Sequence, residues 1–374
     1  MHISQIRSVQ PRLTQPADTP SEQPRPPPPT GTGFVRVAPG LLGKTSRLRS
    51  LGLWAIGLAG FLAVVLVALH FGSLQKMLEL ARSARPGWLL VALLAQGATY
   101  LSAAFVWHQA LERAGHPLPL RTLVPLGIAK VFTDQVLPSG GISGTMLVVR
   151  GLITRRVPGG IAMAAMLVGL VSYDGAYLIV VLASASALWI RHRMNLPLIV
   201  GVAIFVVITL AVPAAVLGLK RWGQRKPIAW VGKCLGGTAL LRELIDAPTE
   251  LLRSPRLLMH TIGLQLAIFL LDAMTLWLAF KAVGEVPALW VVFVSFAIAS
   301  MVATIGPIPV GLGTFEATSV GMLSLLGVSI EVALAGTLLL RGLTFWLPML
   351  PGLWLARREL NRTSDGPAAA CASH

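Results

Sequence analysis

The sequence "VLPSGGISGTMLVVR", residues 136–150, places a proline and three glycines between two of the most apolar regions of the chain. Proline lacks a backbone N–H and glycine is a poor helix former, so a helix that enters this stretch should break there. The stretch "GPIPVGLGTFE", residues 306–316, has the same character in the second half of the chain. These two breaks decide the fold, because each interrupts a segment long enough to enter a lipid bilayer.

The composition indicates a polytopic membrane protein, since 55% of the 374 residues are hydrophobic and only 12% are charged. Apolar runs of roughly 18 residues or more can cross the hydrocarbon core as helices. We predict an all-α protein with six such spans, at residues 51–71, 87–111, 159–190, 197–219, 257–280 and 331–356. Two further apolar stretches, 122–149 and 288–327, contain the breaks.

The net charge of +16 is spread along the chain and does not form a single patch. Basic residues crowd the proline-rich arm 1–50, which we expect to be disordered, the 220–256 loop and the 357–374 tail. Basic residues that flank spans mark the cytoplasmic side, and no nucleic-acid-binding motif accompanies them. We therefore expect both termini in the cytoplasm and no nucleic-acid partner.

Threading the spans with this rule gives the two broken stretches an unusual path. The segment 112–158 must begin and end in the cytoplasm, so residues 122–149 should form a re-entrant hairpin with its tip at Pro138, Gly140 and Gly141. By the same count, residues 288–327 should re-enter from the outside. The alternative is a bundle of eight ordinary spans, two of them kinked.

The two halves have matching spacings. Pro138 and Pro309 are 171 positions apart, and the predicted spans that begin at 87 and 159 recur after 170 and 172 positions. We predict two repeats, residues 51–196 and 197–356, each with three spans and one hairpin. An odd number of spans inverts the second repeat, and inverted repeats with interrupted helices are typical of transporters that bind substrate at the breaks.

Several motifs resemble those of the lysylphosphatidylglycerol synthase transmembrane (flippase-like) family. They are "QVLPSGG" with a following "VVR", then "IGPIPVGLGTFEA" and "LLLRGLTFWLPMLPG". The resemblance covers roughly residues 50–358, and it implies movement of a charged or sugar-bearing lipid across the bacterial inner membrane. Only residues 357–374 follow the last predicted span, so we expect no aminoacyl transferase domain and no lysyl-lipid synthesis. Family members often carry Asn before the first Leu-Pro, where this chain has Asp134 and Gln135.

Charged residues inside apolar segments are candidate site residues, because each costs about 3 kcal/mol or more at mid-membrane. Lys130 and Asp134 have the i,i+4 spacing of a helical pair, which could equally serve only to neutralise both charges. Arg150, Glu316 and Arg341 match family positions, although Arg150 could be a simple cytoplasmic anchor. The predicted substrate-binding residues are Lys130, Asp134, Pro138, Gly140, Gly141, Arg150, Pro309, Gly311, Gly313, Glu316 and Arg341.

Glu316 and Arg341 are predicted to form an ion pair with which a lipid phosphate competes, because an arginine fork suits phosphate. Asp174 and Asp272 lie deep in their spans and could line a proton or cation route, or could form hydrogen bonds between helices. His108, beside Trp107 near a span end, is interpreted as an interfacial residue.

No catalytic or metal-binding pattern occurs in the sequence, so we expect neither a cofactor nor a metal. The main alternative to a transporter is an integral-membrane enzyme, or enzyme subunit, acting on polyprenyl-linked or glycolipid substrates. A scaffold for cell-envelope partners is a third possibility. The expected partners are membrane lipids, anionic or glycosylated, with a second copy of the chain or cell-envelope synthesis enzymes as further candidates.

Overall fold

The computed structural model describes residues 85–136, 141–223, 247–248, 250–306 and 311–371. All of them belong to one compact unit, Arg47–His374. The predicted arm 1–50, the predicted span 51–71 and most of the basic loop 220–256 lie outside the described residues. Pro138, Gly140 and Pro309 lie outside them as well.

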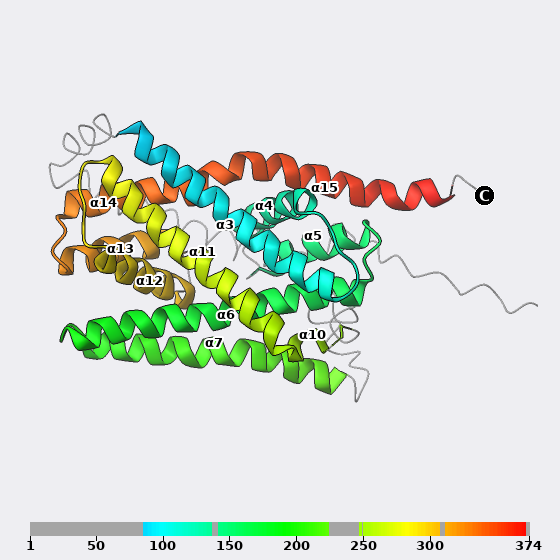
Figure 1. Ribbon diagram of the computed structural model, residues 1–374, viewed down its shortest axis with the longest axis horizontal. Coiled ribbons are helices and arrows are strands. Elements are labelled where there is room, and N and C mark those ends of the chain that lie inside the picture. Colours follow the sequence, from blue (N-terminus) through cyan, green and yellow to red (C-terminus); the bar gives the residue numbers. More distant parts are fainter. Residues whose placement is uncertain (1–84, 137–140, 224–246, 249, 307–310, 372–374) are drawn as a thin grey trace, which may run out of the picture. The chain divides into compact units, whose positions relative to one another are not determined.

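In the part of the chain that the structure describes, five segments are long and apolar enough to cross a membrane, and Figure 1 shows how they are arranged. They confirm five of the six predicted spans. Four are α3 (Pro86–Arg113), α6 (Gly159–Ile190), α7 (Leu196–Gly223) and α11 (Pro255–Ala282). The fifth, Ile330–Arg362, begins as α14 (Ile330–Arg341), passes through the π-helical turn η2 (Gly342–Trp346) and continues as α15 (Leu347–Cys371). Helix α15 therefore runs through residue 356, where the predicted tail begins.

Helices α3 and α11 run antiparallel and pack along each other (Figure 1). The amide of Arg85, just before α3, donates to the carbonyl of Ala282 at the end of α11, over 2.8 Å. Near the same end, Lys281 of α11 lies over the indole rings of Trp88 and Trp277, at 4.5 and 4.0 Å from their centroids. The antiparallel pair is thus held at one end by a backbone bond and a cation enclosed by aromatic rings.

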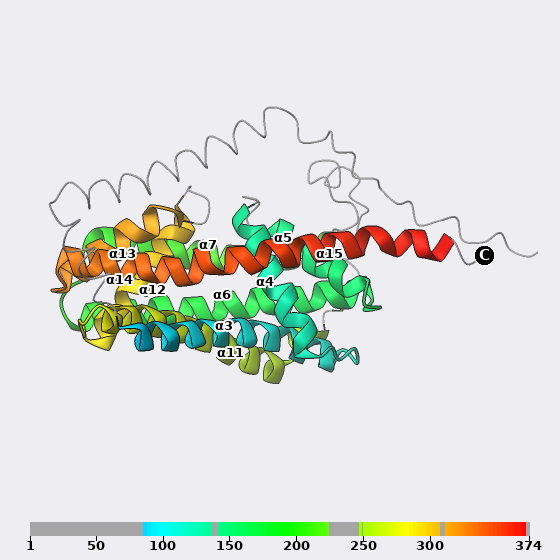
Figure 2. The ribbon, with the colours of Figure 1, turned by 90° about the horizontal axis from the view of Figure 1, so that it is seen from above.

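Two helical hairpins lie toward opposite ends of the long helices (Figure 2). The first is α4 (Leu120–Val136) with α5 (Ile142–Ile153), and the second is α12 (Leu289–Ile305) with α13 (Thr314–Leu325). Within each hairpin the two helices pack together. The hairpins correspond to the stretches in which the sequence predicted breaks.

The two halves share their helix lengths. Helices α3 and α11 both have 28 residues, α4 and α12 both have 17, and α5 and α13 both have 12. The short loops before α4 and α12 each contain a glycine with positive φ, Gly115 at 77° and Gly284 at 89°.

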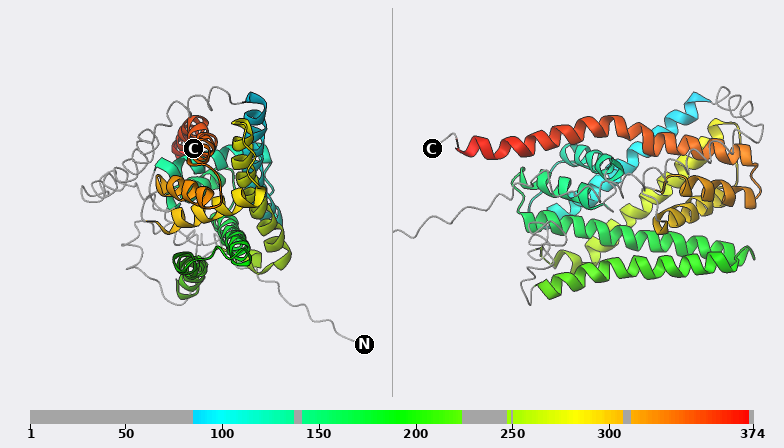
Figure 3. Two further views of the ribbon diagram at one scale, coloured as in Figure 1. Left: turned by 90° about the vertical axis from the view of Figure 1, so that its left-hand side faces the viewer. Right: turned by 180° about the vertical axis from the view of Figure 1, so that it is seen from behind.

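Each hairpin has its own apolar core. One cluster joins α3, α4 and α5 with the start of α6, and its members include Trp107, Leu126 and Val148. The other joins the end of α6 with α11, α12, α13 and α14, through residues such as Phe280, Ile298 and Leu323. Helix α7 adds little to either core: it lies beside α6 (Figures 1 and 3), and only 11% of its most apolar window is buried. This exposure is what a helix facing lipid requires.

Two short helical pieces complete the described chain. Helix α10 (Glu250–Arg253) has four residues and precedes α11. The turn η2 departs from α-helical pairing, because the Leu347 amide donates to the carbonyl of Gly342, five residues back. Pro348 and Pro351 follow at once and lack the N–H groups that would continue regular pairing. Such single π-helical turns are frequent at functional sites.

Candidate functional site

A cavity of about 400 Å³ lies where α6, α11, α12, α13 and the α14–η2 segment meet. Its lining combines one arginine and one aspartate with hydroxyl groups and aromatic rings. The lining residues are Gln135, Tyr173, Tyr177, Ile268, Phe269, Asp272, Phe296, Ser300, Ala303, Thr304, Phe315, Leu340, Arg341, Thr344 and Phe345. Gln135, the penultimate residue of α4, brings the first hairpin to the same cavity.

The predicted ion pair between Glu316 and Arg341 is present in the structure. Arg341 Nε lies 2.7 Å from Glu316 Oε1, and the side chains of Arg341 and Glu316 are only 13% and 0% exposed. The guanidinium also donates from Nη2 to the carbonyl of Gly311, over 3.3 Å, and its Cζ lies 4.3 Å from the centre of the Phe315 ring. The cavity therefore contains a guanidinium fork already positioned by a carboxylate, a carbonyl and an aromatic face.

Glu316 also stabilises the start of α13. It is the third residue of that helix, and its Oε2 accepts a hydrogen bond of 2.7 Å from the Gly313 amide. A carboxylate at this position satisfies a free backbone donor and interacts favourably with the helix dipole. Gly311, with φ +65°, leaves room for Ala303, because a Cβ at Gly311 would lie 2.5 Å from the Ala303 Cβ. Glycine is therefore required at position 311 both by the backbone conformation and by the close approach of Ala303.

The other cavity wall carries oxygen atoms. Asp272 of α11 lines the cavity, and the hydroxyls of Tyr177 on α6 and Thr304 on α12 lie 3.0 Å apart. Tyr177 also stacks on Phe269, with ring centroids 4.8 Å apart. Asp174, the other aspartate predicted to line a proton or cation route, is not among the lining residues.

The predicted charged pair of the first hairpin, Lys130 and Asp134, lies away from the cavity and contacts the backbone of α5. Lys130 Nζ lies 2.6 Å from Asp134 Oδ2, and both side chains are about a quarter exposed. Asp134 Oδ1 accepts a hydrogen bond of 3.0 Å from the amide of Gly144, the third residue of α5. A Cβ at Gly144 would collide with this carboxylate. The pair thus joins the two arms of the hairpin across the break, and neither charge lines the cavity.

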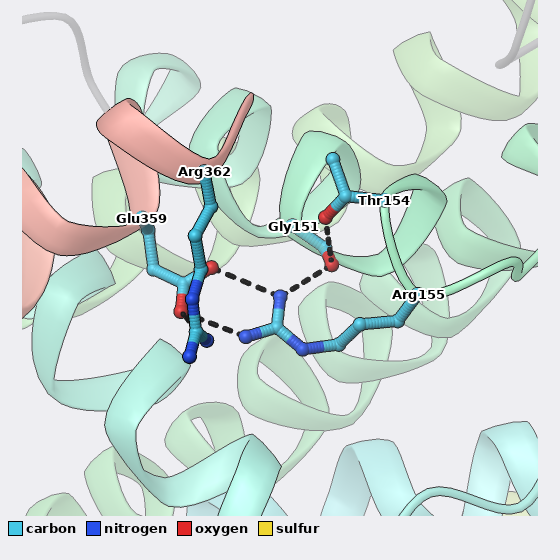
Figure 4. Close-up of polar contacts among 5 residues, drawn as sticks. All are labelled: Gly151, Thr154, Arg155, Glu359 and Arg362. Atoms are coloured by element: carbon cyan, nitrogen blue, oxygen red, sulfur yellow. Dashed lines mark hydrogen bonds and ion pairs between the residues drawn. The ribbon is translucent and has the colours of Figure 1, made fainter. Parts of the chain in front are cut away.

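Arg150 lies in the last turn of α5, and its side chain is exposed. The structure does not bring Arg150 to the cavity, whereas the neighbouring Arg155 makes a specific contact (Figure 4). Arg155 forms a two-pronged interaction with Glu359 of α15, with Nη1 to Oε2 at 2.9 Å and Nη2 to Oε1 at 2.7 Å. Nη1 also donates to the Gly151 carbonyl, over 2.6 Å, and Arg362 approaches Glu359 to 3.3 Å.

This cluster joins the C-terminal end of α5, in the first hairpin, to α15. Glu359 is only 5% exposed although it lies near the end of the apolar segment Ile330–Arg362, midway along α15. Nearby, Gly352 of α15 packs so closely on α4 that a Cβ there would lie 2.6 Å from the Cβ of Phe132. Neither Arg155 nor Glu359 was predicted from the sequence as a site residue, because residues 204 positions apart give no local signal.

His108 is partly buried near the end of α3. Its Nδ1 lies 2.8 Å from the carbonyl of Leu118 in the loop that follows, and its Nε2 lies 3.9 Å from Glu112. The neighbouring Trp107 is buried between α4 and α6, where it packs on Gly127 and Gly169. His108 thus fixes the loop that leads into the first hairpin.

Comparison with protein families decides the relationship. The sequence model described as the lysylphosphatidylglycerol synthase TM region matches residues 54–352. The chain belongs to this family. The matched residues contain both hairpins and the cavity, and family membership together with five long apolar helices makes the chain a multi-pass membrane protein. A search of curated proteins finds no match.

Several cavity residues of this family member were not predicted from the sequence. Tyr173, Tyr177, Phe315 and Phe345 are aromatic residues in apolar helices, where composition alone does not distinguish them from core residues. The polar Gln135, next to Asp134 in the first motif, was noted only as a departure from the family pattern. Its position in the break was the one available signal.

Proposed function

We propose that this protein moves a lipid with a charged or sugar-bearing head group between the two leaflets of the bacterial inner membrane. The observation that carries the proposal is the cavity between the two hairpins, lined by Arg341, which pairs with the buried Glu316. Non-helical backbone at membrane depth is tolerated where it lines a polar cavity, and transporters bind their substrates at such breaks.

The proposed membrane arrangement has six spans, including residues 51–71, and two re-entrant hairpins in an inverted repeat. The equal helix lengths of the two halves support the repeat. The outer ends of α4 and α5 lie at one end of the long helices and those of α12 and α13 at the other (Figure 2), which supports entry from opposite faces. Cysteines placed at 112–118 and 152–157 should then both be labelled from the cytoplasm only, whereas labelling from opposite sides would contradict the arrangement.

Arg341 is proposed to bind the lipid phosphate. In the structure its guanidinium interacts with Glu316, the Gly311 carbonyl and the Phe315 face, which together hold it at the cavity. A phosphate entering the cavity must lose its hydration shell, and a guanidinium fork can replace part of it with two parallel hydrogen bonds. Glu316 then holds Arg341 when the cavity is empty and yields to the phosphate when it is full.

The test is lipid movement in proteoliposomes that contain NBD-labelled phosphatidylglycerol. Dithionite destroys the label only in the outer leaflet, so active protein should expose a larger fraction than the outer half. We expect the Arg341→Ala variant to lose at least tenfold in rate, and Arg341→Lys nearly as much, since lysine keeps the charge and loses the fork. The control is Arg358→Ala, because Arg358 is exposed on α15 beside Trp354.

Two outcomes would contradict the proposal. Normal transport by Arg341→Ala would make Arg341 a packing residue only. A change in the mass of the recovered lipid, with no movement of label, would favour the alternative, an integral-membrane enzyme or enzyme subunit acting on polyprenyl-linked or glycolipid substrates. That alternative shares the cavity but requires a chemical step on the lipid.

A further inference from the structure

Asp272 is the acidic residue of the cavity that the proposed lipid-binding contacts leave unused. It lies within α11 and lines the cavity, and its Oδ1 is buried without a hydrogen-bond partner. Among the residues that the structure describes, Asp272 forms no ion pair. An ionised carboxylate in such a place costs several kcal/mol, so the site favours whatever neutralises it.

Among the described residues, the groups that face Asp272 offer it no fixed positive charge. Helix α3 contributes Tyr100 and Gln96, whose side chain hydrogen-bonds the Asp272 carboxylate, and α6 contributes Tyr173. Helix α12 contributes the cavity hydroxyls of Ser300 and Thr304, which do not ionise. The cation in the cavity wall, Arg341 of α14, is already paired with Glu316 at 2.7 Å. On α11 itself, His260 and Lys281 lie more than two turns away.

A metal cation is a poor candidate for the neutralising species. Calcium and magnesium ions in proteins are bound by six or more oxygens, usually with more than one carboxylate. Asp272 is the only carboxylate side chain among the cavity-lining residues, since Asp174 is absent from the lining and Glu316 is engaged by Arg341 and Gly313. A single carboxylate surrounded by hydroxyls is instead suited to bind and release a proton.

We propose that Asp272 binds one proton in each transport cycle and thereby couples lipid movement to the proton gradient. This inference rests on the proposed transport function and adds its energy source. The carboxylate takes a proton from water on one side and becomes neutral while the cavity is closed to water. It returns the proton to water on the other side when the cavity opens there. The hydroxyls of Tyr177 and Thr304, 3.0 Å apart, lie in the same wall and can relay the proton.

The test uses the same proteoliposomes with a pH gradient of one unit across the membrane. If one proton accompanies each lipid, the gradient supports an asymmetry of about tenfold in labelled lipid at equilibrium, because one pH unit corresponds to a factor of ten. A pH-sensitive dye inside the vesicles should record proton entry when labelled phosphatidylglycerol is supplied. The ratio of transport with and without the gradient is the measured quantity for each variant.

We expect Asp272→Asn to bring this ratio to one and to abolish the dye signal, and Asp272→Glu to retain both. The matched control is Asp174→Asn, the same chemical change on α6 outside the cavity, which should keep the wild-type ratio. Lipid movement by the wild type without any response to the gradient would overturn the inference and leave the transport function standing. So would an unchanged ratio in Asp272→Asn, or its loss in Asp174→Asn alone.

If the wild type moves no labelled lipid, the proposed function fails and the coupling fails with it. If Asp272→Asn does not insert into membranes, the wild-type dye signal and the Asp272→Glu variant decide the question. A wild type that moves lipid without proton entry then rejects the coupling.

Discussion

The two hairpins have equal helix lengths, yet a carboxylate stabilises each turn from a different place. In α12–α13 the carboxylate belongs to the third residue of the second arm, Glu316, which is fully buried and paired with Arg341 of α14. In α4–α5 the third residue of the second arm is Gly144, and the carboxylate reaches it from the end of the first arm, at Asp134.

The difference shows which hairpin is linked to the cavity through its ion pair. In the first hairpin the carboxylate of Asp134 is partly exposed and pairs with Lys130 on the same helix. The two charges of this hairpin therefore compensate each other without a third helix. The second hairpin needs Arg341 from a separate helix, and that arginine lines the cavity. A ligand that competes for Arg341 therefore acts on the second hairpin and leaves the charges of the first undisturbed.

The largest expected effect is a difference in stability loss between variants of the two carboxylates, Glu316 and Asp134. Glu316→Ala leaves a buried arginine unpaired and should lower the free energy of unfolding by about 3–5 kcal/mol. Asp134→Ala removes a helix-capping acceptor and a partly exposed pair and should cost about 1–2 kcal/mol. Thermal unfolding in detergent, followed by circular dichroism, measures both. Equal losses would mean that the hairpins are stabilised alike, against the comparison.

The next effect separates the glycines of the two turns. Gly311→Ala combines a positive φ of 65° with a Cβ only 2.5 Å from the Cβ of Ala303, so it should cost about 2–4 kcal/mol and reduce lipid transport. Gly141→Ala has φ +86° but meets no atom within 4 Å, so it should cost about 1–2 kcal/mol. Melting temperatures of the two variants decide this. A larger loss at Gly141 would show that φ alone governs both turns.

A third test addresses the contact between Arg155, at the C-terminal end of α5, and Glu359 of α15. Glu359→Gln removes the charge that binds Arg155 and Arg362 and should cost about 1–3 kcal/mol, since a charged acceptor is lost at a site only 5% exposed. Limited proteolysis at the 154–157 loop should become faster if the hairpin end loosens. The matched control is Glu112→Gln on α3, whose side chain is 65% exposed and should not change the cleavage rate.

The smallest effect is expected at Lys130. Its pair with Asp134 has the i,i+4 spacing of a helix surface pair, so Lys130→Ala should change the free energy of unfolding by no more than about 0.5 kcal/mol. Asp134 keeps its bond to Gly144 in this variant. Transport in proteoliposomes should stay close to the wild-type rate, and a tenfold loss would instead make Lys130 a substrate contact.

The sequence predicts the five described spans closely because apolar length carries that information locally. The predicted span 159–190 coincides with α6, and the predicted spans 87–111 and 257–280 each lie within two residues of α3 and α11 at both ends. The breaks follow from Pro and Gly for the same reason. The Glu316–Arg341 pair was predictable because two charges in apolar segments need counter-charges.

Other parts of the site depend on contacts that leave no local trace. Arg155 and Glu359 both lie in basic segments that flank predicted spans. Charged residues are expected in such segments, so neither residue is distinguished there by its charge. The bond from Asp134 to Gly144 requires the exact register of two helix arms. Likewise, only packing shows that Asp272 lines the cavity and Asp174 does not, since both occupy apolar helices.

The π-helical turn Gly342–Trp346 has a consequence for helical phase. Arg341 and Glu359 are 18 residues apart, about five full turns, so a continuous α-helix would point both side chains in the same direction. The wider turn holds one extra residue and rotates everything after it by roughly 100°. Arg341 can then point to the second hairpin while Glu359 points to the first. Removing one residue from 342–346 would turn one of the two away from its partner, so the length of this helix is constrained as well as its composition.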